Sequence, residues 1–255
     1  RHMKKVLAWV LCLMLTLGMV SVASAEFAPV NKDDLKVGFV FIGDVSDKGY
    51  TYAHYQGLLD MQQNLGLSDD QILIKTNVSE DSSCETALRE LVEAGCQIIF
   101  GNSYGYMNYM AELADEYPEV IFSHCSGYMS NDTNFNNYFG RIYQARYLAG
   151  IAAGLKSLEL DNYNIGYVAA YGTDYAETCS GINAFALGAQ AVNPEAIVHV
   201  NVLNAWADEI NEKAMAEDLI DNYNCGVIAQ HCDSAQPQIA AEAKGVFGCG
   251  YNSDM

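Results

Sequence analysis

The sequence predicts an α/β protein with two Rossmann-like lobes, each built on a parallel β-sheet. Short apolar runs rich in β-branched residues alternate with segments of helical periodicity, and polar turn residues follow nearly every run. The alternation pauses near residue 140 and then begins again. Such alternation is typical of parallel sheets with helices on their faces. We therefore divide the chain into an N-terminal lobe at residues 36–140 and a C-terminal lobe at residues 141–255.

The first lobe shows four short apolar runs that indicate buried strands. They cover residues 37–42, 72–76, 96–100 and 120–124. Helical patterns follow the first three runs, starting near Tyr50 and covering residues 84–94 and 107–116. Gly95 is expected to end the second of these helices, as glycine commonly does. The polar segment 130–137 (SNDTNFNN) is predicted to be a loop or linker.

The second lobe repeats this alternation. Its predicted strands cover residues 164–169, 197–202, 226–230 and 245–250. Its predicted helices cover residues 143–155, 176–191, 209–222 and 234–243. A lobe that stops after four strands lacks its usual closing elements. We therefore expect that this sequence is truncated and that the natural protein continues past Met255.

Residues 3–25 have the features of a secretory signal peptide. Lys4 and Lys5 give a basic start, residues 6–20 are apolar, and Ala23-Ser24-Ala25 is a small-residue cleavage site. A membrane anchor is the alternative, but the apolar run is shorter than the roughly 20 residues that span a bilayer. We therefore expect an exported protein, in the periplasm or at the extracellular face of the cytoplasmic membrane.

The composition argues against several classes of partner. Residues 1–25 hold three of the 13 basic residues and none of the 32 acidic ones, which leaves a mature net charge of −22. Nucleic acids and anionic membranes need basic patches, so neither is expected as a partner. Seven of the eight cysteines lie outside the leader, without CxxC or Cys/His metal spacing. We expect mostly buried free thiols, with a disulfide as the alternative, and no metal or cofactor.

The turns after the predicted strands supply the candidate site. Because parallel strands end at one edge of a sheet, these turns should converge where α/β proteins bind ligands. The candidate ligand-binding residues are Asp47, Tyr50, Tyr52, Asn102, Tyr104, Trp206, Asp208, His231, Asp233 and Asp254. Aromatic rings beside amides and carboxylates suit a flat, neutral, nitrogen-rich ligand. A phosphate fits poorly, because no glycine-rich phosphate loop occurs.

Several candidates also have a plainer structural interpretation. Asp47 could cap the helix that follows it, and Tyr50 could belong to the core. Trp206 could be a packing residue, His231 a near-core histidine and Asp254 an ordinary turn residue. No H-E-x-x-H motif occurs, and with only five histidines a Ser/His/Asp set is not indicated, so we expect a binding protein rather than an enzyme.

Six segments, in order along the chain, resemble signatures of the basic membrane protein (BMP) family. They are DVSDKGYTYAHYQG, RIYQARYLAGIAAG, GINAFALGAQAVNP, NAWAD, IAQHCDSAQPQ and KGVFGCGYNSDM. The resemblance implies a type I periplasmic-binding-protein fold and a substrate-binding protein that delivers purine bases or nucleosides to an ABC permease. It implies aromatic contacts to the purine from Tyr50 and Trp206, with Asp47 and Asp254 as polar contacts. Tyr50 stands where Trp or Phe is commoner in the family.

Other functions stay open at this point. A sugar or an autoinducer-like molecule could be the ligand, and the chain could be a ligand-sensing receptor domain. A nucleoside-processing enzyme is a third alternative, which turnover of adenosine or inosine would establish. The T-Y-A-H start of the first helix resembles the subgroup associated with adenine-like bases. Base and nucleoside ligands are not distinguished.

Overall fold

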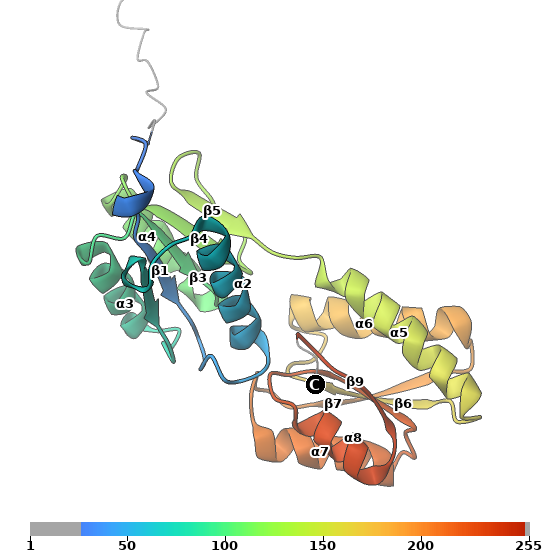
Figure 1. The fold of residues 1–255 in the computed structure, drawn as a ribbon. Helices are drawn as coiled ribbons and strands as arrows, with labels where there is room; N and C mark the ends of the chain where they lie inside the picture. Colours follow the sequence, from blue (N-terminus) through green and yellow to red (C-terminus); the bar gives the residue numbers. More distant parts are fainter. Residues whose placement is uncertain (1–26, 253–255) are drawn as a thin grey trace, which may run out of the picture.

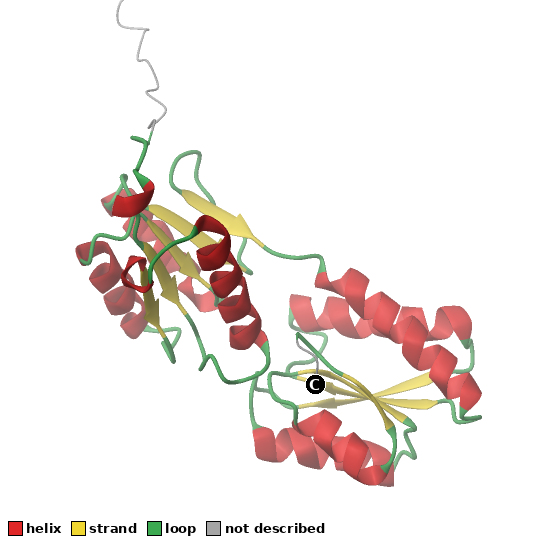
Figure 2. Ribbon diagram, viewed as in Figure 1, coloured by secondary structure: helices red, strands yellow, loops and turns green. Residues whose placement is uncertain are grey.

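The structure is a computed structural model that describes residues 27–252. Two parallel β-sheets with helices on their faces form two lobes, which Figures 1 and 2 show side by side. We call the elements from β1 to β5 the N-terminal lobe and those from α5 to β9 the C-terminal lobe. The predicted α/β class is confirmed. The predicted signal peptide at residues 3–25 and Asp254 lie outside the described residues, and the division at residue 140 stays a prediction.

The N-terminal lobe has a five-stranded parallel sheet of order β2-β1-β3-β4-β5. Its strands are β1 (Val37–Val40), β2 (Ile72–Lys75), β3 (Ile98–Gly101), β4 (Ile121–Cys125) and β5 (Phe135–Tyr138). Its α-helices are α2 (Tyr50–Leu65), α3 (Ser82–Glu93) and α4 (Met107–Glu116). Three short 3-10 helices complete it, namely η1 (Lys32–Asp34), η2 (Asp69–Gln71) and η3 (Tyr104–Tyr106).

Strand β5 corrects the prediction of a loop at residues 130–137. It pairs in parallel with β4, with Phe135 opposite Phe122. The preceding turn is built by asparagines, because Asn131 Oδ1 accepts hydrogen bonds from three successive backbone N–H groups. The buried Asn134 amide donates to three backbone carbonyls between residues 114 and 120. The asparagines that indicated a linker therefore hold the turn before β5 and fix this edge strand in place.

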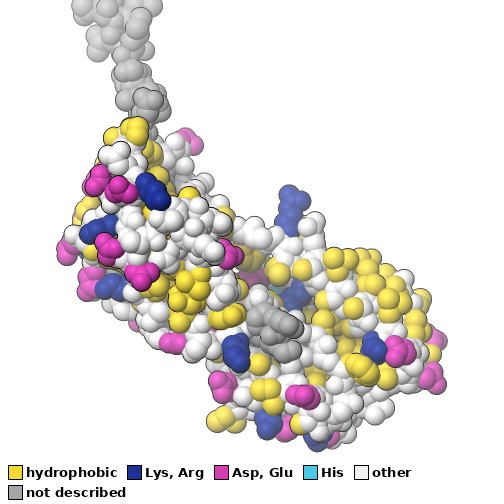
Figure 3. All heavy atoms as spheres, viewed as in Figure 1, with side chains coloured by type: hydrophobic (Ala, Val, Ile, Leu, Met, Phe, Trp, Pro, Cys, Tyr) yellow, Lys and Arg dark blue, Asp and Glu magenta, His cyan; other side chains and the backbone are white. Residues whose placement is uncertain are grey.

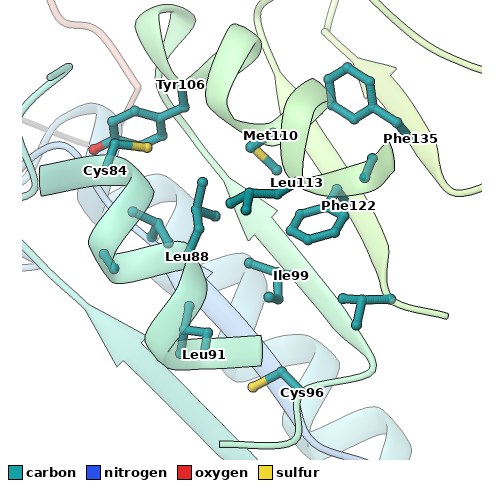
Figure 4. Packing of buried hydrophobic residues seen from close by; sticks show 14 of the residues in the cluster. Cys84, Leu88, Leu91, Cys96, Ile99, Tyr106, Met110, Leu113, Phe122 and Phe135 are labelled. Carbon is teal, nitrogen blue, oxygen red and sulfur yellow. The ribbon is translucent and has the colours of Figure 1, made fainter. Parts of the chain in front are cut away.

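Helices cover both faces of the N-terminal sheet. Leu91 from α3 and Leu113 from α4 pack with Ile99 of β3 in the cluster that Figure 4 shows. On the opposite face, Leu58 of α2 packs against Phe39 of β1. These contacts fix the strand ends, and therefore the turns that follow them.

The C-terminal lobe has a four-stranded parallel sheet of order β7-β6-β8-β9. Its strands are β6 (Asn164–Ala169), β7 (Ile197–Val202), β8 (Val227–His231) and β9 (Phe247–Cys249). Its helices are α5 (Ile142–Glu159), α6 (Ala176–Val192), α7 (Glu209–Asp221) and α8 (Gln236–Lys244). Helices α5 and α6 cover one face of the sheet, and α7 and α8 cover the other (Figure 2).

Helices α5 and α6 touch along their backbones, at a contact that we call the α5–α6 seam. A Cβ atom on Gly150 would lie 2.1 Å from the carbonyl oxygen of Phe185. A Cβ atom on Gly188 would lie 2.0 Å from the carbonyl oxygen of Tyr147. Both distances are too short for any side chain, so glycine is required for this packing.

The outer face of these two helices is apolar. Figure 3 shows hydrophobic side chains gathered over α5 and α6, where Leu148, Leu155 and Leu187 are exposed. None of the helices within residues 27–252 is long and apolar enough to cross a membrane. The seven cysteines among these residues carry free thiols, and five of the seven are buried.

Candidate functional site

A cavity of about 300 Å³ lies between the two lobes. Its lining comes from the turns that follow β1, β2, β3 and β4 in one lobe and β6, β7, β8 and β9 in the other. The carboxyl ends of eight strands therefore face one space, as expected for ligand sites in α/β proteins.

The structure brings six of the ten candidate residues to this cavity. They are Asp47, Tyr50, Asn102, Tyr104, Trp206 and Asp233. Three others, Tyr52, Asp208 and His231, do not line the cavity, and Asp254 lies outside the described residues.

Tyr52 and Asp208 are placed elsewhere for local reasons. Tyr52 lies two residues after Tyr50 on α2, and helix geometry turns it to a different face. Asp208 caps α7, because its side chain accepts hydrogen bonds from the backbone N–H and the side-chain amide of Asn211. The Asp-x-x-Asn pattern before a helix is therefore a capping signal here.

His231 supports the cavity wall from behind. Its Nε2 lies 3.5 Å from a carboxylate oxygen of Glu177, and its ring is tilted against Trp206 and Tyr251. Neither ring nitrogen has a hydrogen-bond partner within residues 27–252. Burial lowers the pKa of His231 to about 4, so the imidazole is neutral near pH 7. His231 is therefore the near-core histidine that the plainer interpretation of the sequence described.

Asp47 has the geometry of a helix cap. Its carboxylate accepts hydrogen bonds from the backbone N–H groups of Gly49 at 2.8 Å, Tyr52 at 2.9 Å and Thr51 at 3.0 Å. A carboxylate at this position also interacts favourably with the positive end of the helix dipole. Asp47 therefore fixes the first turn of α2 while lining the cavity.

Tyr50 and Asn102 form a connected pair in the N-terminal lobe. The Tyr50 hydroxyl donates a 2.6 Å hydrogen bond to the backbone carbonyl of Asn102, and both residues line the cavity. The Asn102 side-chain oxygen accepts from the backbone N–H of Ile42. Its Nδ2 is buried without a hydrogen-bond partner among the described residues. Asn102 therefore offers an unused N–H donor.

Five of the cavity residues that were not candidates carry a carboxyl group or an aromatic ring and line the wall beside the predicted ones. They are Asp44, Glu80, Tyr175, Glu177 and Tyr251. Tyr175 stands edge-on to Trp206, with ring centroids 5.8 Å apart, and extends the aromatic wall of the C-terminal lobe. Glu80 accepts from the Ser103 hydroxyl and the Gly105 backbone N–H, both at 2.6 Å. The signal that could have found Glu80 is its place in the turn after β2.

The cavity combines acidic and aromatic side chains. Its carboxyl groups are those of Asp44, Asp47, Glu80, Glu177 and Asp233. Its aromatic rings are those of Tyr50, Tyr104, Tyr175, Trp206 and Tyr251. Lysine and arginine are absent from the described lining. This lining suits a flat ligand that carries hydrogen-bond donors and no negative charge.

A cavity at the strand ends of two parallel-sheet lobes defines the class of the protein. This arrangement is that of the type I periplasmic binding proteins, which close two lobes over a small ligand. Solved structures share the fold. An ABC transporter solute-binding protein from Conexibacter woesei superposes with a TM-score of 0.69 at 18% identity, over 86% of this chain and 72% of that one. One from Aeropyrum pernix gives 0.70 at 17% identity, over 85% of this chain and 61% of that one.

The family is defined by sequence. The chain belongs to the PnrA-like ABC transporter substrate-binding proteins (Bmp), whose profile matches residues 34–253. This is a family of transport proteins rather than of enzymes, and the resemblance found in the six segments is confirmed.

Two curated relatives are each 36% identical to the chain. A protein of Haloferax volcanii named as an ABC transporter glucose-binding protein aligns over 227 residues, 89% of this chain and 56% of its own length. A purine-binding protein of Brucella abortus aligns over 224 residues, 88% of this chain and 62% of its own length. The chain thus spans less than two thirds of the length of either relative.

Proposed function

We propose that the chain captures a purine base or nucleoside between its lobes and delivers it to an ABC permease. The cavity lining supports this proposal, because aromatic rings from both lobes share the cavity with amide and carboxyl groups. The purine-binding relative agrees with it. We further propose that the protein works outside the cytoplasmic membrane, as the predicted signal peptide and the family imply.

Stacking and hydrogen bonding would share the binding energy. Tyr50 approaches from the N-terminal lobe and Trp206 from the C-terminal lobe, so closure would place a flat ring against both. Each base–aromatic stack contributes about 1–3 kcal/mol in analogous sites. Asn102 would donate to a ring nitrogen or carbonyl, and the carboxyl groups would accept from N–H or hydroxyl groups.

A sugar is the second candidate ligand, because one relative is named glucose-binding. Carboxylates that accept from hydroxyl groups also suit a sugar, and aromatic rings pack on its apolar face. The two ligands differ in how much of their affinity depends on ring stacking.

The test is a calorimetric panel of adenine, adenosine, hypoxanthine and glucose. We expect a purine to bind, and Trp206→Ala to weaken that binding roughly tenfold or more. Tyr128→Ala is the matched control, because Tyr128 is 75% exposed and lies outside the cavity lining. Binding of glucose without any purine would overturn the ligand assignment. Release of free base from adenosine would identify an enzyme instead.

A further inference from the structure

Asp233 is an unusual member of the cavity wall. It follows β8, and its backbone N–H donates a 2.8 Å hydrogen bond to the carbonyl of Trp206. Its Oδ1 atom is buried and has no hydrogen-bond partner among the described residues. A buried, unpartnered carboxyl oxygen costs free energy unless a ligand or a proton satisfies it.

The contact between the lobes places this carboxyl against the start of α2. Asp47 already occupies the N–H groups of Gly49, Thr51 and Tyr52. The remaining N–H of this turn, that of Tyr50, faces the carboxyl of Asp233 from the other lobe. At Gly49 the two backbones touch, because a Cβ there would lie 2.4 Å from the Asp233 carbonyl oxygen. The contact between the lobes therefore shields the Oδ1 atom of Asp233 from water.

The charges around Asp233 oppose its ionisation. Burial raises its pKa well above the ordinary value, and nearby Asp47 before α2, Glu212 on α7 and Glu177 on α6 raise it further. The Tyr50 N–H lowers it. The other titratable neighbours are Tyr251, which follows β9, and Cys232, which follows β8, and burial keeps both neutral by raising the pKa of each.

We propose that Asp233 contacts the ligand as a neutral acid and donates its O–H to an acceptor atom, so that capture takes up a proton from solvent. The acceptor would be a ring nitrogen or a carbonyl oxygen, both of which an ionised carboxylate would repel. The proposal rests on the proposed function in using purines as ligands.

The sign of the pH dependence follows from the two states of the cleft. In the open cleft Asp233 is solvated and ionises near its ordinary pKa, whereas in the closed cleft it ionises well above it. At a pH between these two pKa values, the protein takes up one proton when it captures the ligand. The affinity then falls as pH rises, by at most about tenfold per pH unit.

Calorimetric titration of the full chain with adenine, between about pH 5 and pH 8, measures this linkage. Paired buffers of different ionisation enthalpy give the number of protons taken up. We expect uptake approaching one proton and weaker binding at higher pH. Asp233→Asn keeps an N–H donor, so it should bind with a flat pH profile and without uptake. Asp174→Asn is the matched control, because Asp174 is an exposed carboxylate of the C-terminal lobe that lies outside the cavity lining.

Three results would overturn the proposal. They are the absence of proton uptake by the parent chain, tighter binding at higher pH, and an unchanged slope in Asp233→Asn. If glucose binds and purines do not, the purine proposal fails while the same proton count with glucose still tests Asp233.

A measurement without ligand separates the two proposals further. In the ligand-free open cleft Asp233 ionises near its ordinary pKa, so the stability of the parent chain relative to Asp233→Asn should not change with pH between about 5 and 8. Urea unfolding of both chains across this pH range gives that difference. If the parent chain loses stability relative to Asp233→Asn as pH rises, Asp233 is already neutral before the ligand binds, which would contradict proton uptake on capture.

Discussion

Gly49→Ala tests whether the lobe contact seen here is the ligand-bound contact. Gly49 is the N-cap residue of α2, and an added Cβ would lie 2.4 Å from the carbonyl oxygen of Asp233. Ordinary van der Waals contact starts at 3.4 Å, so the lobes would have to separate by about 1 Å at this point. Each lobe keeps its own core, because the overlap lies between the lobes.

The expected effect is on affinity rather than on folding. Forced overlap in a packed contact costs typically about 1–3 kcal/mol. If this cost falls entirely on the closed state, the dissociation constant for adenine rises by roughly 5- to 150-fold. Calorimetric titration measures this change, and urea unfolding without ligand should show a loss of no more than the roughly 1 kcal/mol that alanine costs relative to glycine at an N-cap.

Gly57→Ala is the matched control on the same helix. A Cβ on Gly57 would meet nothing within 4 Å, so its only effect is the better helix propensity of alanine, about 1 kcal/mol. We expect this variant to be slightly more stable and to bind as the parent does. Parent-like affinity in Gly49→Ala would refute the reasoning, since the lobes would then close without this backbone contact.

Three further changes address the fold. Asp47→Ala removes the acceptor of three N–H groups at the start of α2 and should lower the free energy of unfolding by about 1–2 kcal/mol, measured by urea unfolding. Burial lowers the pKa of both His54 and His231 from 6.5 to about 4, so the unfolded chain binds more protons in this range. The two histidines should therefore cost stability as pH falls from about 6.5 towards 4, which thermal unfolding reports. Gly150→Ala places a Cβ 2.1 Å from the Phe185 carbonyl oxygen and should destabilise the chain by about 1–3 kcal/mol or more, again in urea.

Each of these expectations has its own control. Asp47→Asn keeps one acceptor oxygen and should cost less than the alanine variant; equal stability of all three chains would remove the capping role. His54→Gln should make the acid-side loss of stability smaller, and an unchanged loss would place its origin elsewhere. Gly140→Ala, where a Cβ meets nothing within 4 Å, should leave stability nearly unchanged. Tolerance of alanine at position 150 would contradict the packing of α5 on α6.

Much of the fold could be predicted from periodicity. The strands at residues 164–169 and 197–202 and the helix at 107–116 were predicted with the bounds observed for β6, β7 and α4. Hydrophobic patterns carry this information because central strands such as β6 are buried and a helix such as α4 has one buried side. Strand β5 was missed because an edge strand needs few apolar residues, and because the asparagines before it, Asn131 and Asn134, serve the turn and the neighbouring carbonyls.

The sequence predicted where the candidate site lies, but it did not predict every side chain that lines it. The rule that parallel strands end at one edge located the cavity between the lobes. It could not decide which residue of a turn faces the ligand, because a cap such as Asp208 and a cavity residue such as Asp233 occupy similar sequence positions. His231 illustrates a second limit on such reasoning, since its burial depends on the rings of Trp206 and Tyr251 from other turns.

The α5–α6 seam and the cavity turns are under different constraints. The seam joins two helices, whereas the cavity turns line the space between the lobes. Helix α5 starts directly after residues 139–141, the described segment that crosses between the lobes, while the cavity residues Tyr175 and Glu177 stand at the start of α6. Because the seam joins the two helices backbone to backbone, a rotation at the crossing reaches those cavity residues almost undiminished. Side chains in the cavity turns are free to change as the ligand changes. Gly150 and Gly188 are not free to change. Relatives that bind different ligands should therefore differ in sequence at the strand ends and keep glycine in the seam.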